Sequence, residues 1–223
     1  MRRIVVFMSL AIVLVGLVTT ELATAHAQEA TPAARLGAPD PAECTIEPRP
    51  MAFFEQFIGT PTAEQEAAMA AMAEATPAAG FQMPEGEPAD EDTVANVLET
   101  VWQLGACINA GDFRRYAAVF TEDYFQREFA RFGPIPEEEL AFLSATPEAM
   151  PEENAVALLA VVDIHTLPDG RVAGLFDVQD PFAQPPGPSR FYWEFVQEDG
   201  RWLIDEQIML GSVEPEQVGT PTA

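Results

Sequence analysis

The chain has 223 residues, of which 48% are apolar, enough to bury the core of one domain. Its formal net charge is −25, and it contains 11 arginines and no lysine. A surface this acidic repels phosphate backbones and anionic headgroups, so we expect no nucleic-acid partner. We attribute the acidity to solubility rather than to a specific function.

The N-terminus has the pattern of a secretory signal peptide. Two arginines precede an apolar run over residues 4–18, and small residues stand at Ala25 and Ala27. The run is shorter than the roughly 20 residues that a spanning helix needs. We therefore predict a signal peptide over residues 1–27, cleaved after Ala27, and a secreted or cell-envelope protein without membrane contact after cleavage. The alternative is an uncleaved membrane anchor.

Residues 28–92 are predicted to form an acidic N-terminal region rich in alanine and proline. Most of this region has too little apolar content to fold alone. The exception is 44–59, whose aromatic and aliphatic residues need a surface to cover them. We therefore expect this segment to dock on the main domain.

The two cysteines of the chain, Cys44 and Cys107, both lie in the part predicted to be exported. In an oxidising compartment such a pair is usually joined, so we predict a disulfide, with two buried free thiols as the alternative. Closing a loop of this length is worth about 4 kcal/mol in the chain-entropy model. Two cysteines without a nearby histidine are too few ligands for zinc, and we expect neither a metal site nor a cofactor.

The main domain is predicted to begin with a long helix capped by Asp92 or Thr93. From Val94 to Ile108 its apolar residues recur on one face at helical spacing, and Gly111 suits a left-handed cap at its end. Shorter helices are expected over residues 113–120, capped by Asp112, over 122–131, capped by Thr121, and over 137–145.

Four strands follow, because the hydrophobic period changes from that of a helix to that of a sheet. They cover residues 155–167, 172–178, 190–197 and 202–210. The Asp169-Gly170 and Asp199-Gly200 pairs each indicate a hairpin turn. The predicted fold class is α+β, with an antiparallel sheet covered on one face, a domain over 93–210, and a flexible tail over 211–223.

If both turns have two residues, the strand registers follow. The expected pairs in the second hairpin are Phe195 with Ile204, Trp193 with Glu206, and Phe191 with Ile208. These side chains make one face that is apolar except for Glu206. We expect a ligand pocket between this face and the helix over 94–108, lined by Phe176, Trp193, Phe195, Ile204, Glu206 and Tyr116. The alternatives are a solvated rim position for Glu206 and ordinary core positions for the aromatic residues.

The same assumption places Asp163 opposite Phe176, and His165 opposite Gly174. Asp163 and His165 then point the same way, and His165 is the only histidine after the predicted signal peptide. A carboxylate beside an imidazole can transfer protons, so these two are candidate catalytic residues. The alternative is a solvated pair near a turn. The sequence has no motif for a nucleophilic serine, a phosphate loop or a calcium loop.

Two stretches resemble a known superfamily. "INAGDFRRYAAVFTEDYF" (108–125) ends the long helix, and "EDGRWLIDEQI" (198–208) closes the predicted meander. With the order of elements, they resemble the nuclear transport factor 2-like superfamily, including its SnoaL-like members, over about residues 91–210. The resemblance implies a cone-shaped curved sheet wrapped around a long helix, with a pocket between them. The candidate acid–base residues match no motif of the superfamily.

The resemblance also implies that the exposed face of the sheet can serve as a homodimer surface, here the polar face with Arg190, Tyr192 and Glu194. Three hypotheses remain open, because such a fold does not fix function. The first is a non-enzymatic module that binds a small apolar ligand or a partner. The second is an isomerase or cyclase of ring substrates that uses Asp163 or His165 as base. The third is a cell-envelope interaction protein that uses residues 28–92.

Overall fold

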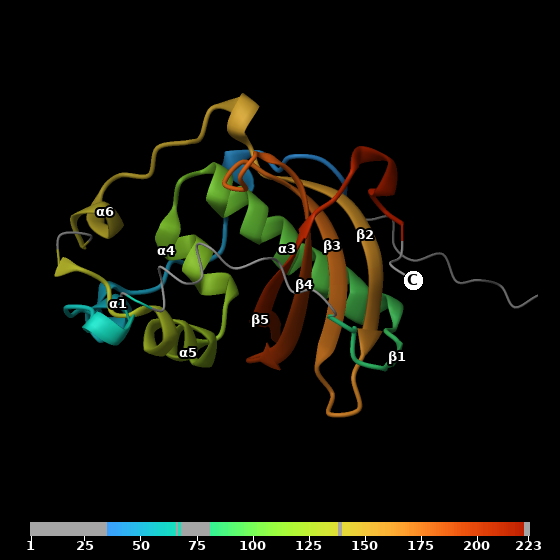
Figure 1. The fold of residues 1–223 in the computed structure, drawn as a ribbon, viewed down its shortest axis with the longest axis horizontal. Coiled ribbons are helices and arrows are strands. Elements are labelled where there is room, and N and C mark those ends of the chain that lie inside the picture. Colours follow the sequence, from blue (N-terminus) through green and yellow to red (C-terminus); the bar gives the residue numbers. More distant parts are fainter. Residues whose placement is uncertain (1–34, 66, 68–80, 138–139, 221–223) are drawn as a thin grey trace, which may run out of the picture. The chain divides into compact units, whose positions relative to one another are not determined.

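The computed structural model describes residues 35–65, 67, 81–137 and 140–220. The predicted signal peptide, residues 1–27, lies outside them. The described part of the chain has the predicted α+β class, with helices and a five-stranded antiparallel sheet in the order β1-β2-β3-β4-β5 (Figure 1). The strands are β1 (Glu87–Pro88), β2 (Ala157–Thr166), β3 (Val172–Asp180), β4 (Gly187–Glu198) and β5 (Arg201–Ser212).

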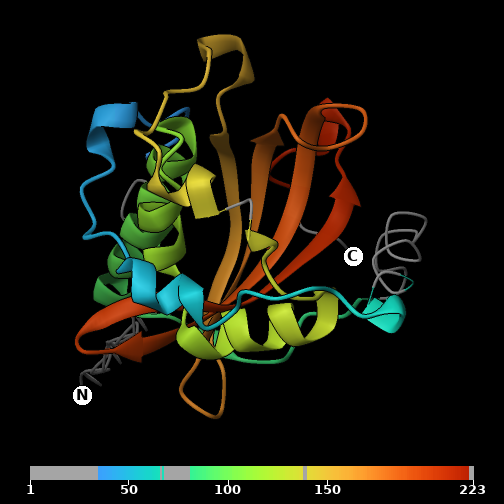
Figure 2. The same cartoon turned by 90° about the vertical axis from the view of Figure 1, so that its left-hand side faces the viewer.

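The longest described helix, α3 (Glu91–Asn109), lies against the sheet, and Figure 2 shows it in green beside the strands. Asp90 caps it in place of the predicted Asp92 or Thr93, because the Asp90 carboxylate accepts a hydrogen bond from the backbone N–H of Thr93 at 2.9 Å. Asp112 and Thr121 cap two further helices, as the sequence predicts. The shorter helices are α1 (Met51–Glu55), α4 (Phe113–Tyr116), α5 (Glu122–Phe132) and α6 (Leu140–Ser144).

The hairpin between β2 and β3 has a longer loop than the sequence suggests, so its predicted register is wrong. The backbone N–H of Leu167 donates to the carbonyl of Arg171, and Thr166 rather than Leu167 pairs with Val172. Loop length sets the register of a hairpin, so the pairs next to the turn shift by one residue. Asp163 consequently lies opposite Leu175, and His165 lies opposite Ala173.

The hairpin between β4 and β5 keeps its Asp-Gly turn, with positive φ at both Asp199 and Gly200. Phe195 pairs with Ile204, as predicted. The register then shifts, because Glu194 pairs with Glu206 and leaves Asp205 as the extra residue of a β-bulge.

The predicted pairs beyond this bulge, Trp193 with Glu206 and Phe191 with Ile208, are therefore wrong. Trp193 pairs with Gln207 instead, and Phe191 pairs with Met209. A one-residue shift moves side chains to the other face of a sheet. Gln207 and Met209 accordingly share the face of Trp193, while Ile208 packs with Tyr192 on the opposite face.

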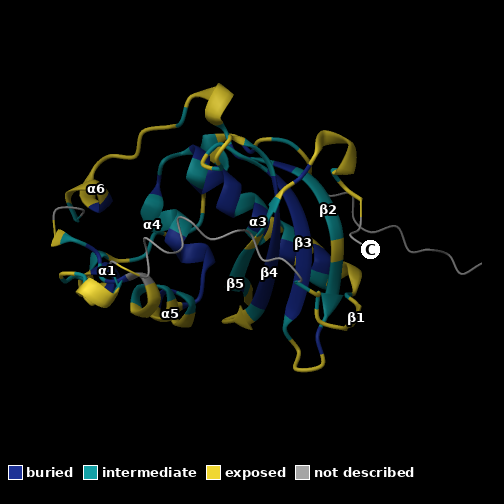
Figure 3. Ribbon diagram, viewed as in Figure 1, coloured by how far each residue is buried: buried dark blue, intermediate teal, exposed yellow. Residues whose placement is uncertain are grey.

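The main hydrophobic core lies between α3 and one face of the sheet, called here the inner face. Val97 and Val101 of α3 pack there with Phe176 of β3 and Phe195 of β4. Strands β3 and β4, in the middle of the sheet, are the most buried (Figure 3). Phe53 of the N-terminal segment joins the same core, so 44–59 packs on the domain.

The opposite, outer face of the sheet is covered by the chain itself. The ring of Phe81 packs 4.7 Å from that of Tyr192. Residues 213–220 pass over a buried ion pair between Asp177 and Arg190, and the backbone N–H of Gly219 donates to Asp177 at 2.7 Å. Arg190, Tyr192 and Glu194 are buried within the chain, which contradicts the prediction of an exposed polar face.

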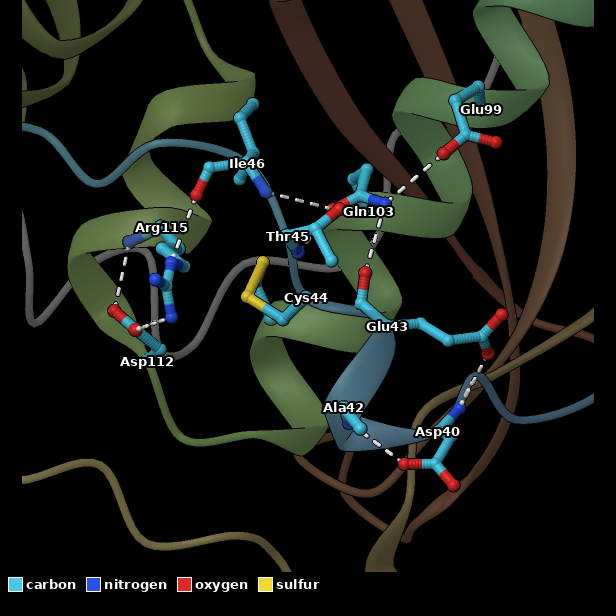
Figure 4. The surroundings of a disulfide bond; sticks show 11 residues. Asp40, Ala42, Glu43, Cys44, Thr45, Ile46, Glu99, Gln103, Asp112 and Arg115 are labelled. Atoms are coloured by element: carbon cyan, nitrogen blue, oxygen red, sulfur yellow. Dashed lines mark hydrogen bonds and ion pairs between the residues drawn. A yellow bond between two sulfur atoms is a disulfide. The ribbon is translucent and has the colours of Figure 1, made fainter.

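The predicted disulfide between Cys44 and Cys107 is confirmed, with a Cα–Cα distance of 4.7 Å. It fastens the N-terminal segment to α3, as Figure 4 shows. Gln103 of α3 supports the same contact, because its side-chain oxygen accepts from the backbone N–H of Thr45 and its amide donates to the carbonyl of Glu43. No helix among the described residues is both long and apolar enough to cross a bilayer.

Candidate ligand cavity

A cavity of about 670 Å³ lies between α3 and the inner face of the sheet. Helix α3 provides one wall and strands β2 to β5 provide another, while Pro39, helices α4 and α6, and the loops before β2 and β4 complete it. The lining residues are mostly apolar: Pro39, Val101, Trp102, Leu104, Gly105, Cys107, Ile108, Gly111, Phe113, Tyr116, Phe142, Met150, Val156, Leu158, Val178, Asp180, Phe182, Phe191, Trp193, Gln207 and Met209.

The N-terminal segment is part of this wall because side chains of α3 hold it in place. Cys107 lines the cavity and is bonded to Cys44. Asn109, which is buried, donates to the carbonyl of Pro39 at 3.1 Å and to that of Val156 at 3.0 Å. Its side-chain oxygen also accepts from the backbone N–H of Val156 at 2.8 Å. One buried amide therefore joins Pro39, α3 and the start of β2 around the cavity.

Large apolar side chains gather where the cavity lining reaches the surface. Phe142, Phe182 and Met209 are 64%, 66% and 47% exposed, and all three line the cavity. Among the described residues only Leu36 is a further large apolar side chain with such exposure. Exposed apolar groups concentrated at a concave site are typical of a surface that contacts a ligand or partner.

Two indole N–H groups at the cavity have no acceptor. The Nε1 atoms of Trp102 and Trp193 are buried, and no hydrogen-bond partner lies near either in the described structure. Trp193 is held by stacking, because its ring lies 4.8 Å from that of Phe176 and 5.7 Å from that of Phe191 at interplanar angles of 28°. A buried donor without an acceptor costs about 1–3 kcal/mol. Both nitrogen atoms have almost no accessible surface, so a molecule in the cavity contacts other atoms of these rings.

Tyr116 supplies the phenol at this site. Burial raises the pKa of Tyr116 to about 12, and the negative charge of Glu128 acts in the same direction. The hydroxyl therefore stays protonated at neutral pH. Asp180 and Gln207 are the other lining residues with polar side-chain heads. Asp180 also accepts a hydrogen bond from the backbone N–H of Phe182 at 2.8 Å, which fixes the loop after β3.

The residues that the sequence suggested for a pocket divide into three groups. Trp193 and Tyr116 line the cavity. Phe176, Phe195 and Ile204 have no exposed surface and pack in the core without lining it. Glu206 pairs with Glu194 on the outer face of the sheet, next to the bulge, and does not line the cavity. Its carboxylate is 3.9 Å from the guanidinium of Arg127.

The candidate catalytic pair, Asp163 and His165, lies away from the cavity. His165 Nδ1 is 3.4 Å from an Asp163 carboxylate oxygen, and its Nε2 is 2.9 Å from the carbonyl oxygen of Pro84. The Asp163 side chain is 56% exposed. Both residues pair with outer-face residues of β3, so neither reaches a molecule held in the cavity. The reason is the register shift at the Leu167–Arg171 loop.

Sequence reasoning missed several lining residues. Gln207 and Met209 reach the inner face only through the bulge at Asp205, which no local pattern indicates. Phe142 lies in a predicted short helix, and Phe182 lies in a proline-rich stretch between two predicted strands. Neither pattern indicates a cavity. Trp102 follows Val101 on α3. Its position next to the apolar face of the predicted helix is the one sequence feature that could have indicated a lining residue.

Within the described ranges, no group of three or more His, Cys, Asp or Glu side chains is arranged to hold a metal ion. Comparison with known proteins gives no match: no protein-family model, curated protein or solved structure matches the chain.

Proposed function

We propose that this protein is an exported binding protein that holds a small, largely apolar molecule between α3 and the inner face of the sheet. The observation that carries the proposal is the cavity of about 670 Å³ with its mostly apolar lining. Ligand sites in proteins have volumes of roughly 300–1,000 Å³ and combine apolar walls with a few polar groups. Tyr116, Asp180 and Gln207 supply such polar groups here.

Binding is favoured over catalysis by the position of the acid–base pair. Asp163 and His165 lie on the outer face, so the hypothesis of an isomerase or cyclase that uses them has no support from the geometry. A carboxylate and an imidazole must lie within hydrogen-bonding reach of a substrate to transfer its proton.

The proposal includes membership of the nuclear transport factor 2-like superfamily, with a cone-shaped sheet. Its support is the order of elements, with helices before an antiparallel meander, and a cavity between the longest described helix and the sheet. Export to the cell envelope or medium is supported by the signal-peptide pattern. The Cys44–Cys107 disulfide is consistent with an oxidising compartment.

The test is a titration of the full chain with N-phenyl-1-naphthylamine, a neutral dye that fluoresces in apolar surroundings. We expect saturable binding of one dye per chain. The variant Val178→Trp should weaken it by about 10-fold or more, because Val178 lines the cavity and the larger ring fills part of it.

The matched control is Val196→Trp, the same change on the neighbouring strand β4 at a residue that does not line the cavity. This variant should bind the dye like the wild type, and thermal unfolding should show that both variants are folded. A wild-type chain without saturable binding, or equal binding by Val178→Trp, would contradict the proposal.

A further inference from the structure

We infer that the molecule held in this cavity is an organic cation, with an apolar ring body inside the cavity and an ammonium group that pairs with the carboxylate of Asp180. The inference rests on the proposed function, because it names the class of ligand that the same cavity binds. It adds to an apolar site a charged contact at one residue and a preference between ligands of different charge.

Asp180 places a carboxylate on the cavity side of the sheet. Side chains alternate between the two faces of a strand, and Asp180 follows Phe176 and Val178 of β3, which pack on the inner face. The pairing of this stretch with β4 has no register shift, so the alternation continues to Asp180. Asp180 lines the cavity and is half-buried, so part of its surface remains accessible.

The Asp180 carboxylate has no basic partner among the described residues. One of its oxygens accepts a hydrogen bond from the backbone N–H of Phe182 at 2.8 Å, and no described residue forms an ion pair with it. Arg190, on the neighbouring strand, pairs with Asp177 on the outer face instead. A partly buried carboxylate favours a nearby positive charge. A cationic ligand would supply that charge.

The surroundings of the cavity favour positive charge and oppose negative charge. None of the lining residues is an arginine, lysine or histidine. The loops before β2 and β4, residues 145–156 and 181–186, contain three glutamates and no basic residue. The net charge of −25 attracts cations and repels anions. A carboxylate or phosphate ligand would enter against this field and would meet no cation in the lining.

The rest of the lining indicates an organic cation rather than a metal ion. A single carboxylate is too few ligands for Ca²⁺ or Mg²⁺, which take about six or more oxygen atoms. A third of the lining residues are aromatic, and the faces of aromatic rings attract ammonium groups as well as apolar bodies. Phe182 is one of these residues, and its backbone hydrogen bond keeps it next to the Asp180 carboxylate. Ring amines and quaternary ammonium compounds meet these conditions.

Three probes with the same bicyclic frame test the charge preference on the wild-type chain. 1-Naphthylmethylamine is a cation at neutral pH, 1-naphthylmethanol is neutral, and 1-naphthoate is an anion. Each is used to displace N-phenyl-1-naphthylamine. We expect the amine to bind about 5-fold more tightly than the alcohol, the effect of one partly exposed ion pair. The carboxylate should bind at least about 5-fold more weakly than the alcohol.

The outcomes separate the inference from the proposed function. An amine that binds no more tightly than the alcohol would overturn the inference and leave the proposed function standing, because the neutral compounds still bind. A carboxylate that binds as tightly as the amine would overturn it as well. If the dye does not bind, or if none of the three probes displaces it, the proposed function fails and the inference fails with it.

The variants Asp180→Asn and Asp199→Asn locate the contact. Each removes one negative charge, and asparagine at position 180 keeps an oxygen for the backbone N–H of Phe182. Asp199 is exposed in the turn after β4, at the opposite end of that strand from Gly187, which pairs with Asp180. Asparagine also suits the positive φ of Asp199.

The measured quantity is the ratio of amine affinity to alcohol affinity within each variant. We expect the ratio to fall to about 1 in Asp180→Asn and to stay at about 5 in Asp199→Asn. Equal ratios in the two variants would contradict the assignment to Asp180. If Asp180→Asn does not fold, a crystal structure of the wild type with 1-naphthylmethylamine decides the question. Its nitrogen should lie about 3 Å from an Asp180 carboxylate oxygen, and a nitrogen placed elsewhere would contradict the inference.

Discussion

At the scale of single residues, burial controls the chemistry of the chain's tyrosines. Burial is the largest cause that raises the pKa of Tyr116, Tyr124 and Tyr192. For Tyr192 the hydrogen bond that its hydroxyl donates to Glu194 adds to the shift. For Tyr124 the neighbouring Tyr116 adds to it. These three are all the tyrosines that the sequence contains.

We predict that no tyrosine of the folded protein ionises near pH 10. A tyrosine whose pKa is raised on folding contributes stability that is complete below the unfolded value of about 10 and is lost as pH rises toward the folded value. Tyrosinate absorbance at 295 nm should therefore appear only together with loss of the near-ultraviolet circular dichroism signal. A rise in absorbance centred near pH 10 while that signal persists would be incompatible with the three buried hydroxyls.

Residue patterns were a good guide to local structure and a poor guide to the cavity's polar groups. Asp112 and Thr121 act as the helix caps that their positions suggest, and the two cysteines are joined. The identity of Asp163 and His165 suggested chemistry, but the face on which they lie depends on the length of the loop that begins at Leu167. The unpaired donors of Trp102 and Trp193 have no sequence signal, because pairing is decided by distant parts of the chain.

At the scale of elements, the bulge in β5 is fixed by a contact with the start of α5. The Thr121 hydroxyl donates to the Asp205 carboxylate at 2.6 Å, and the backbone N–H of Thr121 donates to the carbonyl of Ile204 at 3.0 Å. The same hydroxyl accepts from the backbone N–H of Tyr124 at 2.9 Å, which caps α5. One residue thus begins a helix and holds the bulge that turns Gln207 toward the cavity.

We predict that Thr121→Val lowers the free energy of unfolding by about 2 kcal/mol, because it removes the cap and the donor to Asp205 while keeping the side-chain shape. Urea denaturation followed by circular dichroism measures the change. The control is Thr93→Val in the first turn of α3, where the hydroxyl bond to Asp90 is exposed and the expected change is within about 0.5 kcal/mol. Equal effects of the two substitutions would show that the Thr121–Asp205 contact is not a special one.

The elements themselves could be predicted, but their registers could not. Hydrophobic period and Asp-Gly turns place the long helix and four strands close to their observed bounds. The registers fail at the Leu167–Arg171 loop and at Asp205, because loop length and tertiary contacts decide them rather than local propensity. The short strand β1 was not predicted, because neither Glu87 nor Pro88 is a β-branched or aromatic residue of the kind that indicates a strand.

At the scale of the whole described unit, segments outside the predicted domain complete both faces of the sheet. Pro39 lines the cavity, and Phe53 and Phe54 are buried in the main core. Residues 213–220 cover Asp177 and Arg190 on the other side. A domain limited to residues 93–210 would therefore lose a wall of the cavity and the cover of a buried ion pair. The sequence predicted docking for 44–59. It did not predict that Pro39 or residues 213–220 would pack on the domain, because the composition around them is poor in large apolar residues.

The central claim is that the space between α3 and the inner face of the sheet binds a small, largely apolar molecule. A crystal structure of the full chain with N-phenyl-1-naphthylamine tests it most directly. We expect the dye to lie in this cavity, against lining residues such as Val178 and Trp193. A ligand bound elsewhere on the protein, or a cavity closed by the protein's own side chains, would contradict it.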